Sequence, residues 1–198
     1  MSRGCPRGCF FCHVKDKEGQ KAYKVADLSE FWNGQKKIQI MDPNTLACPE
    51  WKDILKQLAD SRSLVEFNQG VDIRLMTEEK CEMLMAIKIQ RVHFAWDRYQ
   101  DKNSVLPKLE LFAKQTGWDR HKVTVYILVN FDTTIEQDIE RVETIKTLGF
   151  MPYVMRYNKE DIPRGHVLNR LARYANTPLI YTRCPSFDYY LKHENDFR

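Results

Sequence analysis

The sequence predicts an α/β fold built on a parallel β-sheet, and its apolar pattern gives two reasons for this prediction. Short runs typical of strands alternate with stretches whose apolar residues recur at helical spacing, and this unit repeats about five times. The run at 123–130, Val-Thr-Val-Tyr-Ile-Leu-Val-Asn, is almost continuously apolar, as a parallel strand buried on both faces should be. Such units require right-handed crossovers, and the chain has too few of them to close an eight-fold barrel.

The expected elements follow one another without a linker or an internal repeat, so we expect one domain over residues 1–198. Strands are predicted at 36–42, 65–70, 91–97, 123–130 and 152–157, and helices at 49–59, 77–89, 105–114, 134–148 and 166–175. Thr77 is an N-cap candidate because two glutamates follow it in the first helical turn. Thr134 and Gln137 form a capping-box pattern, and Gly149 is placed to end that helix.

The composition excludes a membrane-spanning or secreted protein. The chain has 198 residues, of which 43% are hydrophobic and 29% charged, and no apolar run approaches the ~20 residues that span a bilayer. Six cysteines with one tight triplet indicate intracellular metal chemistry and not a disulfide framework, and we expect a cytoplasmic protein without a membrane partner.

The net charge of +4 is unevenly distributed along the chain. Residues 1–24 carry six lysines and arginines against two aspartates and glutamates, and residues 156–183 again carry six against two. These two basic segments are either a contact surface for an anionic substrate or cofactor, or ordinary solvated charges. Nucleic acid is not excluded as a partner.

Cys5, Cys9 and Cys12 form the pattern C-x3-C-x2-C, with Gly4 and Gly8 each preceding a cysteine. Thiolates are the usual ligands of iron–sulfur clusters, and three of them leave one iron open for another ligand. Glycines before two ligands allow the tight turns that such a loop needs. The alternative is a zinc site completed by Cys48 or a histidine. Cys48, Cys81 and Cys184 are not grouped, so we expect no second cluster.

Polar residues follow the predicted strands, where the active residues of parallel α/β barrels gather. Candidates for binding a ligand there are Asp42, Asn44, Asn68, Gln69, Asp72, Arg74, Asp97 and Asn130. Two of them also have purely structural readings. Asp42 precedes Pro43 and suits an ordinary turn, and Asp72 can pair with Arg74 or Arg98.

The cysteine triplet, with Phe11 at its aromatic position, resembles the C-x3-C-x-aromatic-C signature of the radical SAM superfamily. The segments IMDPNTLACPEW, NQGVDIRLMTEE, HFAWD, VNFDTTIEQDIERV and PYVMRY further resemble a group of uncharacterised radical SAM proteins from bacterial and phage genomes, over nearly the whole chain. The resemblance implies a partial (β/α)6 TIM-like barrel. It also implies a [4Fe–4S] cluster on Cys5, Cys9 and Cys12 whose open iron binds S-adenosylmethionine (SAM), with reductive cleavage to a 5′-deoxyadenosyl radical that abstracts hydrogen from an unidentified substrate.

The same resemblance implies roles for the strand-end residues. Asp42, with Asn44 behind it, stands in for the family's absent Gly-Gly-Glu motif at the methionine amino group. Asn68, Gln69 and Asp72 suit the ribose or the methionine carboxylate, and Arg74 suits a bidentate pair with that carboxylate. Asp97 is expected at the ribose hydroxyls, and Asn130 at adenine with Phe11 on the other side. The implied reductant is a protein such as flavodoxin or ferredoxin.

Two further expectations concern departures from the family. Only Met1–Gly4 precede Cys5, which is too short for the family's first strand, so we expect an unpaired edge beside 36–42, an exposed cluster and self-association. The competing functions are a zinc-stabilised nucleic-acid-binding module that uses the basic segments, and a truncated, inactive relative of the radical SAM enzymes.

Overall fold

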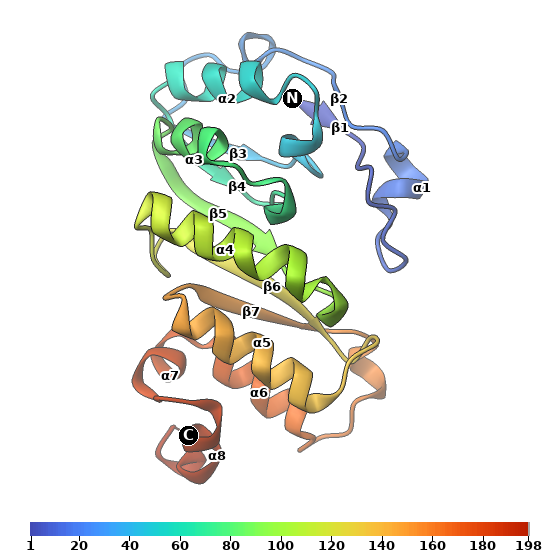
Figure 1. Ribbon diagram of the computed structural model, residues 1–198, viewed down its shortest axis with the longest axis vertical. Coiled ribbons are helices and arrows are strands. Elements are labelled where there is room, and N and C mark those ends of the chain that lie inside the picture. The colour runs from blue at the N-terminus through green and yellow to red at the C-terminus, as the bar shows by residue number, and fades with distance from the viewer. Residues whose placement is uncertain (198) are drawn as a thin grey trace. The chain divides into compact units, whose positions relative to one another are not determined.

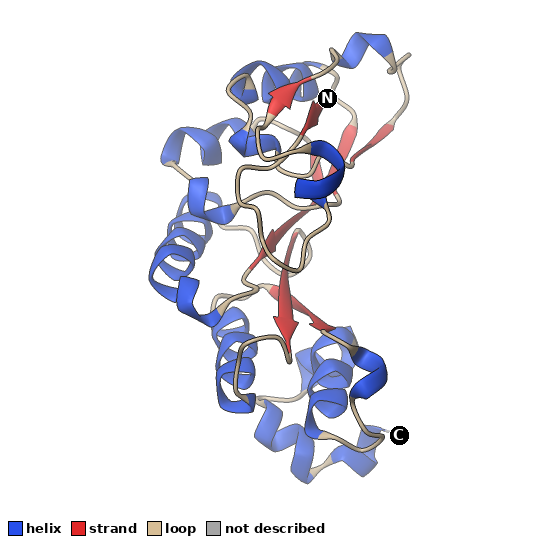
Figure 2. Cartoon of the chain, turned by 90° about the vertical axis from the view of Figure 1, so that its right-hand side faces the viewer, coloured by secondary structure: helices blue, strands red, loops and turns tan. Residues whose placement is uncertain are grey.

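A computed structural model describes residues 1–197, and in it the chain divides into two compact units. The first unit comprises Met1–Phe94 and Pro107–Trp118, and the second comprises Ala95–Leu106 and the chain from Asp119 onward. The sequence, by contrast, shows one continuous alternation of elements over its whole length. Each unit contains both helices and strands, which are blue and red in Figure 2.

Five strands form the main sheet: β3 (Lys37–Ile40), β4 (Leu64–Phe67), β5 (Ile89–Ala95), β6 (Val123–Val129) and β7 (Met151–Arg156). Their order is β3-β4-β5-β6-β7, and the pairs β3–β4, β4–β5 and β6–β7 are parallel. The predicted α/β fold with a parallel sheet is therefore confirmed, and each strand overlaps its predicted range. The strand order has β3 and β7 at its two ends and shows no barrel closure, so the partial barrel stays a prediction.

In the first unit, two helices pack against the strands through apolar faces. They are α2 (Trp51–Asp60) and α3 (Glu78–Met85), which lie beside β3 and β4 in Figure 1. Ile38 and Ile40 of β3 are buried while the alternate residues are exposed, so only one face of this strand contributes to the core. Phe112 of α4 (Lys102–Thr116) is fully buried and packs edge-on against Phe94, with ring centroids 4.8 Å apart.

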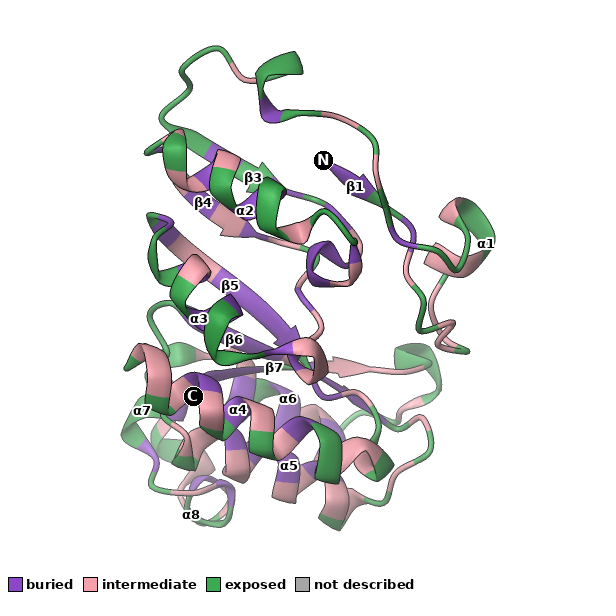
Figure 3. Ribbon diagram, turned by 45° about the horizontal axis from the view of Figure 1, so that its top comes forward, coloured by how far each residue is buried: buried purple, intermediate pink, exposed green. Residues whose placement is uncertain are grey.

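The N-terminal segment forms a small sheet of its own. β1 (Ser2–Arg3) pairs antiparallel with β2 (Tyr23–Lys24), so the residues before Cys5 do form a strand, although one of only two residues outside the main sheet. Met1–Gly4 is indeed too short to add a strand to the main sheet, in which β3 is an edge strand, but its two central residues are long enough to pair with β2. Between the two strands, the short helix α1 (Val14–Glu18) buries no residue, as Figure 3 shows.

In the second unit, β6 and β7 carry helices that bury apolar faces against them. These are α5 (Ile135–Thr147) and α6 (Val167–Asn176), followed by α7 (Pro178–Arg183) and α8 (Phe187–Lys192), which the apolar pattern did not predict. Buried Tyr174 of α6 explains their position, because its ring packs against aromatic rings of both α7 and α8. The capping box of Thr134 and Gln137 is confirmed, and Gly149 follows α5 with a left-handed φ of 74°.

Several element boundaries differ from the sequence prediction, most of all the end of α3. The helix expected at 77–89 ends at Met85, because Ile89 already belongs to β5 and pairs with Val65 of β4. Short 3₁₀ helices also occupy several loops: η1 (Leu28–Glu30), η2 (Thr45–Ala47), η3 (Ile73–Leu75), η4 (Tyr99–Asp101), η5 (Lys159–Asp161) and η6 (Glu194–Phe197). Within residues 1–197, no helix has the length and apolarity needed to cross a bilayer.

Phe112→Ala tests the core of the first unit. Removing this fully buried ring leaves a cavity against Phe94, and Trp118 also loses its edge-on partner, so we expect a loss of about 3–5 kcal/mol in the free energy of unfolding. Urea denaturation followed by circular dichroism measures it. Phe31→Ala, at a side chain that is 49% exposed, is the matched control and should change stability by less than about 0.5 kcal/mol. Equal losses in both variants would contradict this packing.

Candidate functional site

The cysteine loop, residues 5–12, is held at its start by hydrogen bonds to Glu18 and Gly19. The Cys5 amide donates to Gly19 O at 3.2 Å, and the Gly4 amide donates to Glu18 Oε2 at 3.0 Å. Gly4 has φ +75°, and a Cβ there would meet Lys21 O at 2.1 Å. Gly8 is also left-handed, with φ +56°. The predicted need for glycine at both positions is therefore confirmed, because other residues adopt this conformation only at a cost.

The three thiols of this loop are all partly exposed, unlike the other three cysteines of the chain, which are buried. Within residues 1–197, no group of three or more His, Cys, Asp or Glu side chains is arranged to hold a metal ion. Cys5, Cys9 and Cys12 thus supply the donor chemistry of a cluster on one short loop, but their sulfurs do not converge as a finished site. Phe11 lies between two of them and is partly buried.

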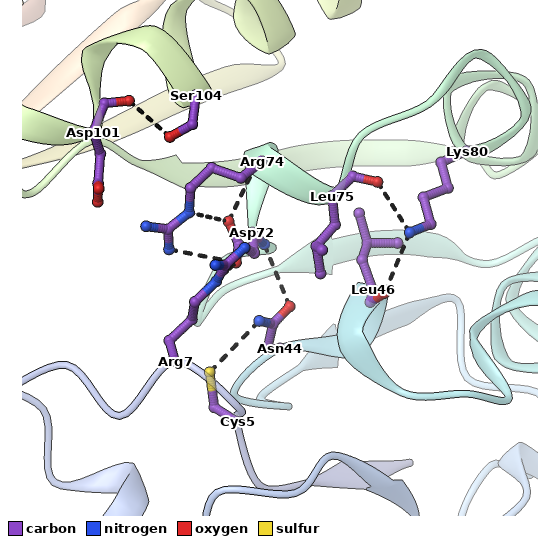
Figure 4. Close-up of polar contacts among 10 residues, drawn as sticks. All are labelled: Cys5, Arg7, Asn44, Leu46, Asp72, Arg74, Leu75, Lys80, Asp101 and Ser104. Atoms are coloured by element: carbon purple, nitrogen blue, oxygen red, sulfur yellow. Dashed lines mark hydrogen bonds and ion pairs between the residues drawn. The ribbon is translucent and has the colours of Figure 1, made fainter.

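Asn44 connects the cysteine loop to the ends of two strands. It is 3% exposed and lies between β3 and η2. Its Nδ2 donates to Cys5 Sγ at 3.5 Å, and its Oδ1 accepts from the backbone amide of Asp72 at 3.4 Å. One buried amide therefore joins the first cysteine to the loops after β3 and β4, as Figure 4 shows.

Asp72 lies between two guanidinium groups (Figure 4). Its carboxylate accepts from Arg74 Nε at 2.7 Å and from the Arg74 backbone amide at 3.1 Å, and it forms an ion pair with Arg7 of the cysteine loop. Burial works to raise the pKa of Asp72, but the hydrogen bonds and charges of Arg74 and Arg7 outweigh it and lower that pKa below its ordinary value. The structure thus brings Asn44, Asp72 and Arg74 together with Cys5 and Arg7.

Lys80 of α3, which the sequence analysis did not identify, donates hydrogen bonds to the loops after β3 and β4. Its Nζ donates to Leu75 O at 3.0 Å and to Leu46 O at 3.4 Å, and lies 4.9 Å from the centre of the Trp51 ring. The residue is 9% exposed, and burial lowers its pKa. The available signal was its position four residues before buried Leu84, on the apolar face of the helix.

A cavity of about 410 Å³ adjoins the cysteine loop within this unit. Its lining residues are Pro6, Arg7, Leu46, Ala47, Cys48, Pro49, Trp51 and Leu75. Mostly apolar walls with one cation are usual for small-molecule sites of this size. The Cys48 thiol donates to Glu50 Oε2 at 3.1 Å, and its pKa is raised to about 11, mainly by burial.

Asp42, Asn68 and Gln69 lie outside this network. The Asp42 carboxylate is buried and accepts from Ser2 N at 2.5 Å, from Ser2 Oγ at 2.7 Å and from the Met1 nitrogen at 3.1 Å. It is thus neither an ordinary turn residue nor directed at the other candidates. Asn68 Nδ2 contacts Met41 Sδ at 3.3 Å, and Gln69 is exposed.

Asp97 and Asn130 belong to the second unit and follow β5 and β6. Asn130 has a left-handed φ of 65°, and its Nδ2 donates to Tyr157 O at 3.1 Å. Asp97 is partly buried, and its carbonyl accepts from Arg141 Nη1 at 3.0 Å. A left-handed asparagine at a strand end is a common feature of functional loops. Here, however, the Asn130 side-chain amide is already hydrogen-bonded to the carbonyl of Tyr157, which follows β7.

Arg141 of α5 fixes both of these strand ends and was also missed by the sequence analysis. This fully buried guanidinium donates to Trp96 O at 2.6 Å, to Leu128 O at 2.8 Å and to Asp138 Oδ1 at 2.5 Å. Burial raises the pKa of Asp138 and lowers that of Arg141, which shows the desolvation cost of the pair. Its position beside Val142 on the apolar helix face was the only sequence signal.

Comparisons with known proteins add no family to this description. No protein-family model matches the chain, and no curated protein matches it.

Asp72→Asn tests the network at the cysteine loop. Weakening two charge-assisted contacts should lower the free energy of unfolding by about 2 kcal/mol at pH 7. Because the pKa of Asp72 is lowered, its contribution is present above the ordinary value of 3.8 and is lost as the pH falls below it. The difference between wild type and variant, measured by urea denaturation, should therefore shrink below about pH 4.

The matched control is Asp60→Asn, at an exposed carboxylate paired with Lys56. It should cost at most about 0.5 kcal/mol, because surface pairs in water contribute little. If the Asp72 variant loses no more than this control, the buried ion network does not stabilise the protein.

Proposed function

We propose that this protein is a radical SAM enzyme that uses a [4Fe–4S] cluster on Cys5, Cys9 and Cys12. The observation that carries the proposal is the connection of the cysteine loop, through the Asn44 amide, to the carboxyl ends of β3 and β4. Ligands in parallel α/β sheets bind at that edge.

The residues fit such a cluster in their donor chemistry, and binding it would require the three sulfurs to converge. Three thiols within eight residues provide three iron ligands, their partial exposure allows assembly, and the left-handed glycines give the loop its turns. When bound, the cluster and SAM would supply reductive cleavage of SAM to methionine and a 5′-deoxyadenosyl radical that takes hydrogen from the substrate.

The chain's own residues hold and tune this site. The Asn44 amide donates toward the Cys5 sulfur, and such hydrogen bonds favour the more reduced state of a cluster. Arg74 is committed to Asp72, so its role is to orient that carboxylate and, through Arg7, the cysteine loop. The adjoining cavity provides room for a small molecule beside the loop. Contacts of Phe11, Asp42, Asn68 and Gln69 to SAM are part of this proposal and rest on the family resemblance.

The first test is cluster content. Protein reconstituted anaerobically with iron and sulfide should bind about four irons and four sulfides per chain. Cys5→Ala, Cys9→Ala and Cys12→Ala should each abolish this content, because each removes an iron ligand. Cys81→Ala, at a buried cysteine outside the loop, is the control and should retain it. One tightly bound zinc with no labile sulfide would instead favour the zinc-stabilised module.

The second test is turnover with a chemical reductant. Dithionite-reduced protein should convert SAM to 5′-deoxyadenosine and methionine, quantified by liquid chromatography. Asn44→Ala should keep the cluster but make its reduction potential more negative and slow this cleavage, because the hydrogen bond to Cys5 is lost. Asn103→Ala, at an exposed amide of α4, should behave as wild type. Protein with a complete, reducible cluster that neither binds nor cleaves SAM would indicate the inactive relative.

A further inference from the structure

A second cavity, of about 220 Å³, lies wholly within the second unit. Its lining residues are Arg120, Lys146, Gly149, Phe150, Tyr181 and Thr182. They come from the turn before β6, from the end of α5 and the short loop that leads into β7, and from α7. The cavity therefore adjoins the amino ends of β6 and β7, whereas the cysteine loop belongs to the first unit.

Two cations line this cavity, and no carboxylate does. Arg120 is exposed, and its guanidinium forms no ion pair or hydrogen bond within residues 1–197. The partly buried Lys146 ammonium donates to the Tyr181 carbonyl and lies 3.9 Å from the centre of the Tyr181 ring. Only one of its three protons is used in a hydrogen bond. The described part of the chain thus supplies two positive charges at one cavity and no ion-pair partner for either.

The acidic residues nearest to these cations in the sequence are engaged elsewhere. Asp119 precedes Arg120, and its Oδ1 accepts from a backbone amide of the same turn at 2.9 Å. Glu143 lies one helical turn before Lys146, and its Oε1 accepts from the Phe187 amide at 2.8 Å. Neither carboxylate is paired with Arg120 or Lys146 in the described residues, so the positive charge at the cavity is not neutralised by a direct contact.

Holding two cations together has a cost that an anion would remove. Burial lowers the pKa of Lys146, the charge of Glu143 acts against this shift, and the positive charge of Arg120 adds to it. Lys146 lies in the last turn of α5, where the helix dipole favours a cation. The dipole does not account for a second cation at the same cavity, whereas a bound anion would offset both charges.

We propose that this cavity binds a phosphate group, held by Arg120 and Lys146. A phosphate monoester carries about 1.5 to 2 negative charges at pH 7, which matches two cations better than the single charge of a carboxylate. A guanidinium can contact two phosphate oxygens at once, and an ammonium adds a point charge. The Thr182 hydroxyl donates to Pro178 O at 2.8 Å, and the Gly149 amide donates to Lys146 O at 2.9 Å, so the two cations are the donors left for the ligand. This inference does not rest on the proposed function.

The observations favour a small molecule over a nucleic acid as the source of the phosphate. A bound strand needs cations spread along its backbone. Three of the six cations in the basic segment 156–183 are instead engaged within the protein. Arg170 and Arg173 pair with Glu194 at 3.6 and 3.9 Å, and Arg156 donates to Asn169. The uncompensated charge is concentrated at one cavity of small-molecule size.

The test is isothermal titration calorimetry of the full chain with inorganic phosphate and, separately, with ribose 5-phosphate. Arg120→Gln should weaken binding at least tenfold, because it removes the charged, two-point donor, and Arg120→Lys should weaken it less. Arg164→Gln, at an exposed arginine of the same unit outside the cavity, is the matched control and should change affinity less than twofold. Tighter binding of inorganic phosphate would support the site with the free ion as its ligand, and tighter binding of ribose 5-phosphate would support it with an esterified phosphate.

Lys146→Gln should also weaken binding at least tenfold. This variant loses the hydrogen bond to the Tyr181 carbonyl, so its fold is checked by circular dichroism, and the exposed Arg120 tests the site even if Lys146→Gln does not fold. Wild type that binds neither probe at millimolar concentrations would overturn the proposal, as would equal affinities of Arg120→Gln and Arg164→Gln. A single-stranded DNA oligonucleotide that binds more tightly and displaces ribose 5-phosphate would show a nucleic-acid surface instead.

Discussion

The arrangement of the candidate site depends on one buried side chain, Asn44, which contacts two separate parts of the first unit. Its amide nitrogen reaches Cys5 and its oxygen accepts from the Asp72 backbone, so the cysteine loop and the loop after β4 are held together by the same planar group. Asp72 in turn forms ion pairs with Arg7 of the cysteine loop and with Arg74 of its own loop. Buried polar groups of this kind stabilise a structure only when all are satisfied together, which makes the network specific for one arrangement of the loop.

Buried cations perform a similar function in each unit. Lys80 donates to carbonyls of the loops after β3 and β4, and Arg141 donates to carbonyls at the ends of β5 and β6. Both residues lie on helices. Burial lowers the pKa of each side chain, which shows that its charge is held at a desolvation cost. An apolar residue at either position would avoid that cost but would leave the carbonyls without a donor. The benefit is therefore positional, because backbone carbonyls of strand-end loops without regular hydrogen bonding receive a fixed side-chain donor.

These features explain which parts were predictable from sequence. The strands and the caps at Thr77 and Thr134 follow from local patterns, and the structure confirms them. Asn44, Asp72 and Arg74 were identified because polar residues after parallel strands gather at one edge, and they do meet Cys5 or one another. Lys80 and Arg141 were missed because an apolar-periodicity rule assigns charged residues to the surface. The partners of Asp42 could not be predicted either, since they depend on where the N-terminal strand β1 lies.

The polar contacts also bear on how a metal would be acquired. A loop that is unstructured without its metal must be ordered by the metal itself, so binding and folding become a single event. Here the cysteine loop is already held by the Cys5–Gly19 and Gly4–Glu18 hydrogen bonds, by Asn44 and by the Arg7–Asp72 pair. For the proposed cluster, only the three sulfurs would still have to converge, and their partial exposure would permit this rearrangement. The cost of ordering the loop therefore falls on the folding of the first unit, and assembly of the proposed cluster would require mainly local adjustment between Cys5 and Cys12.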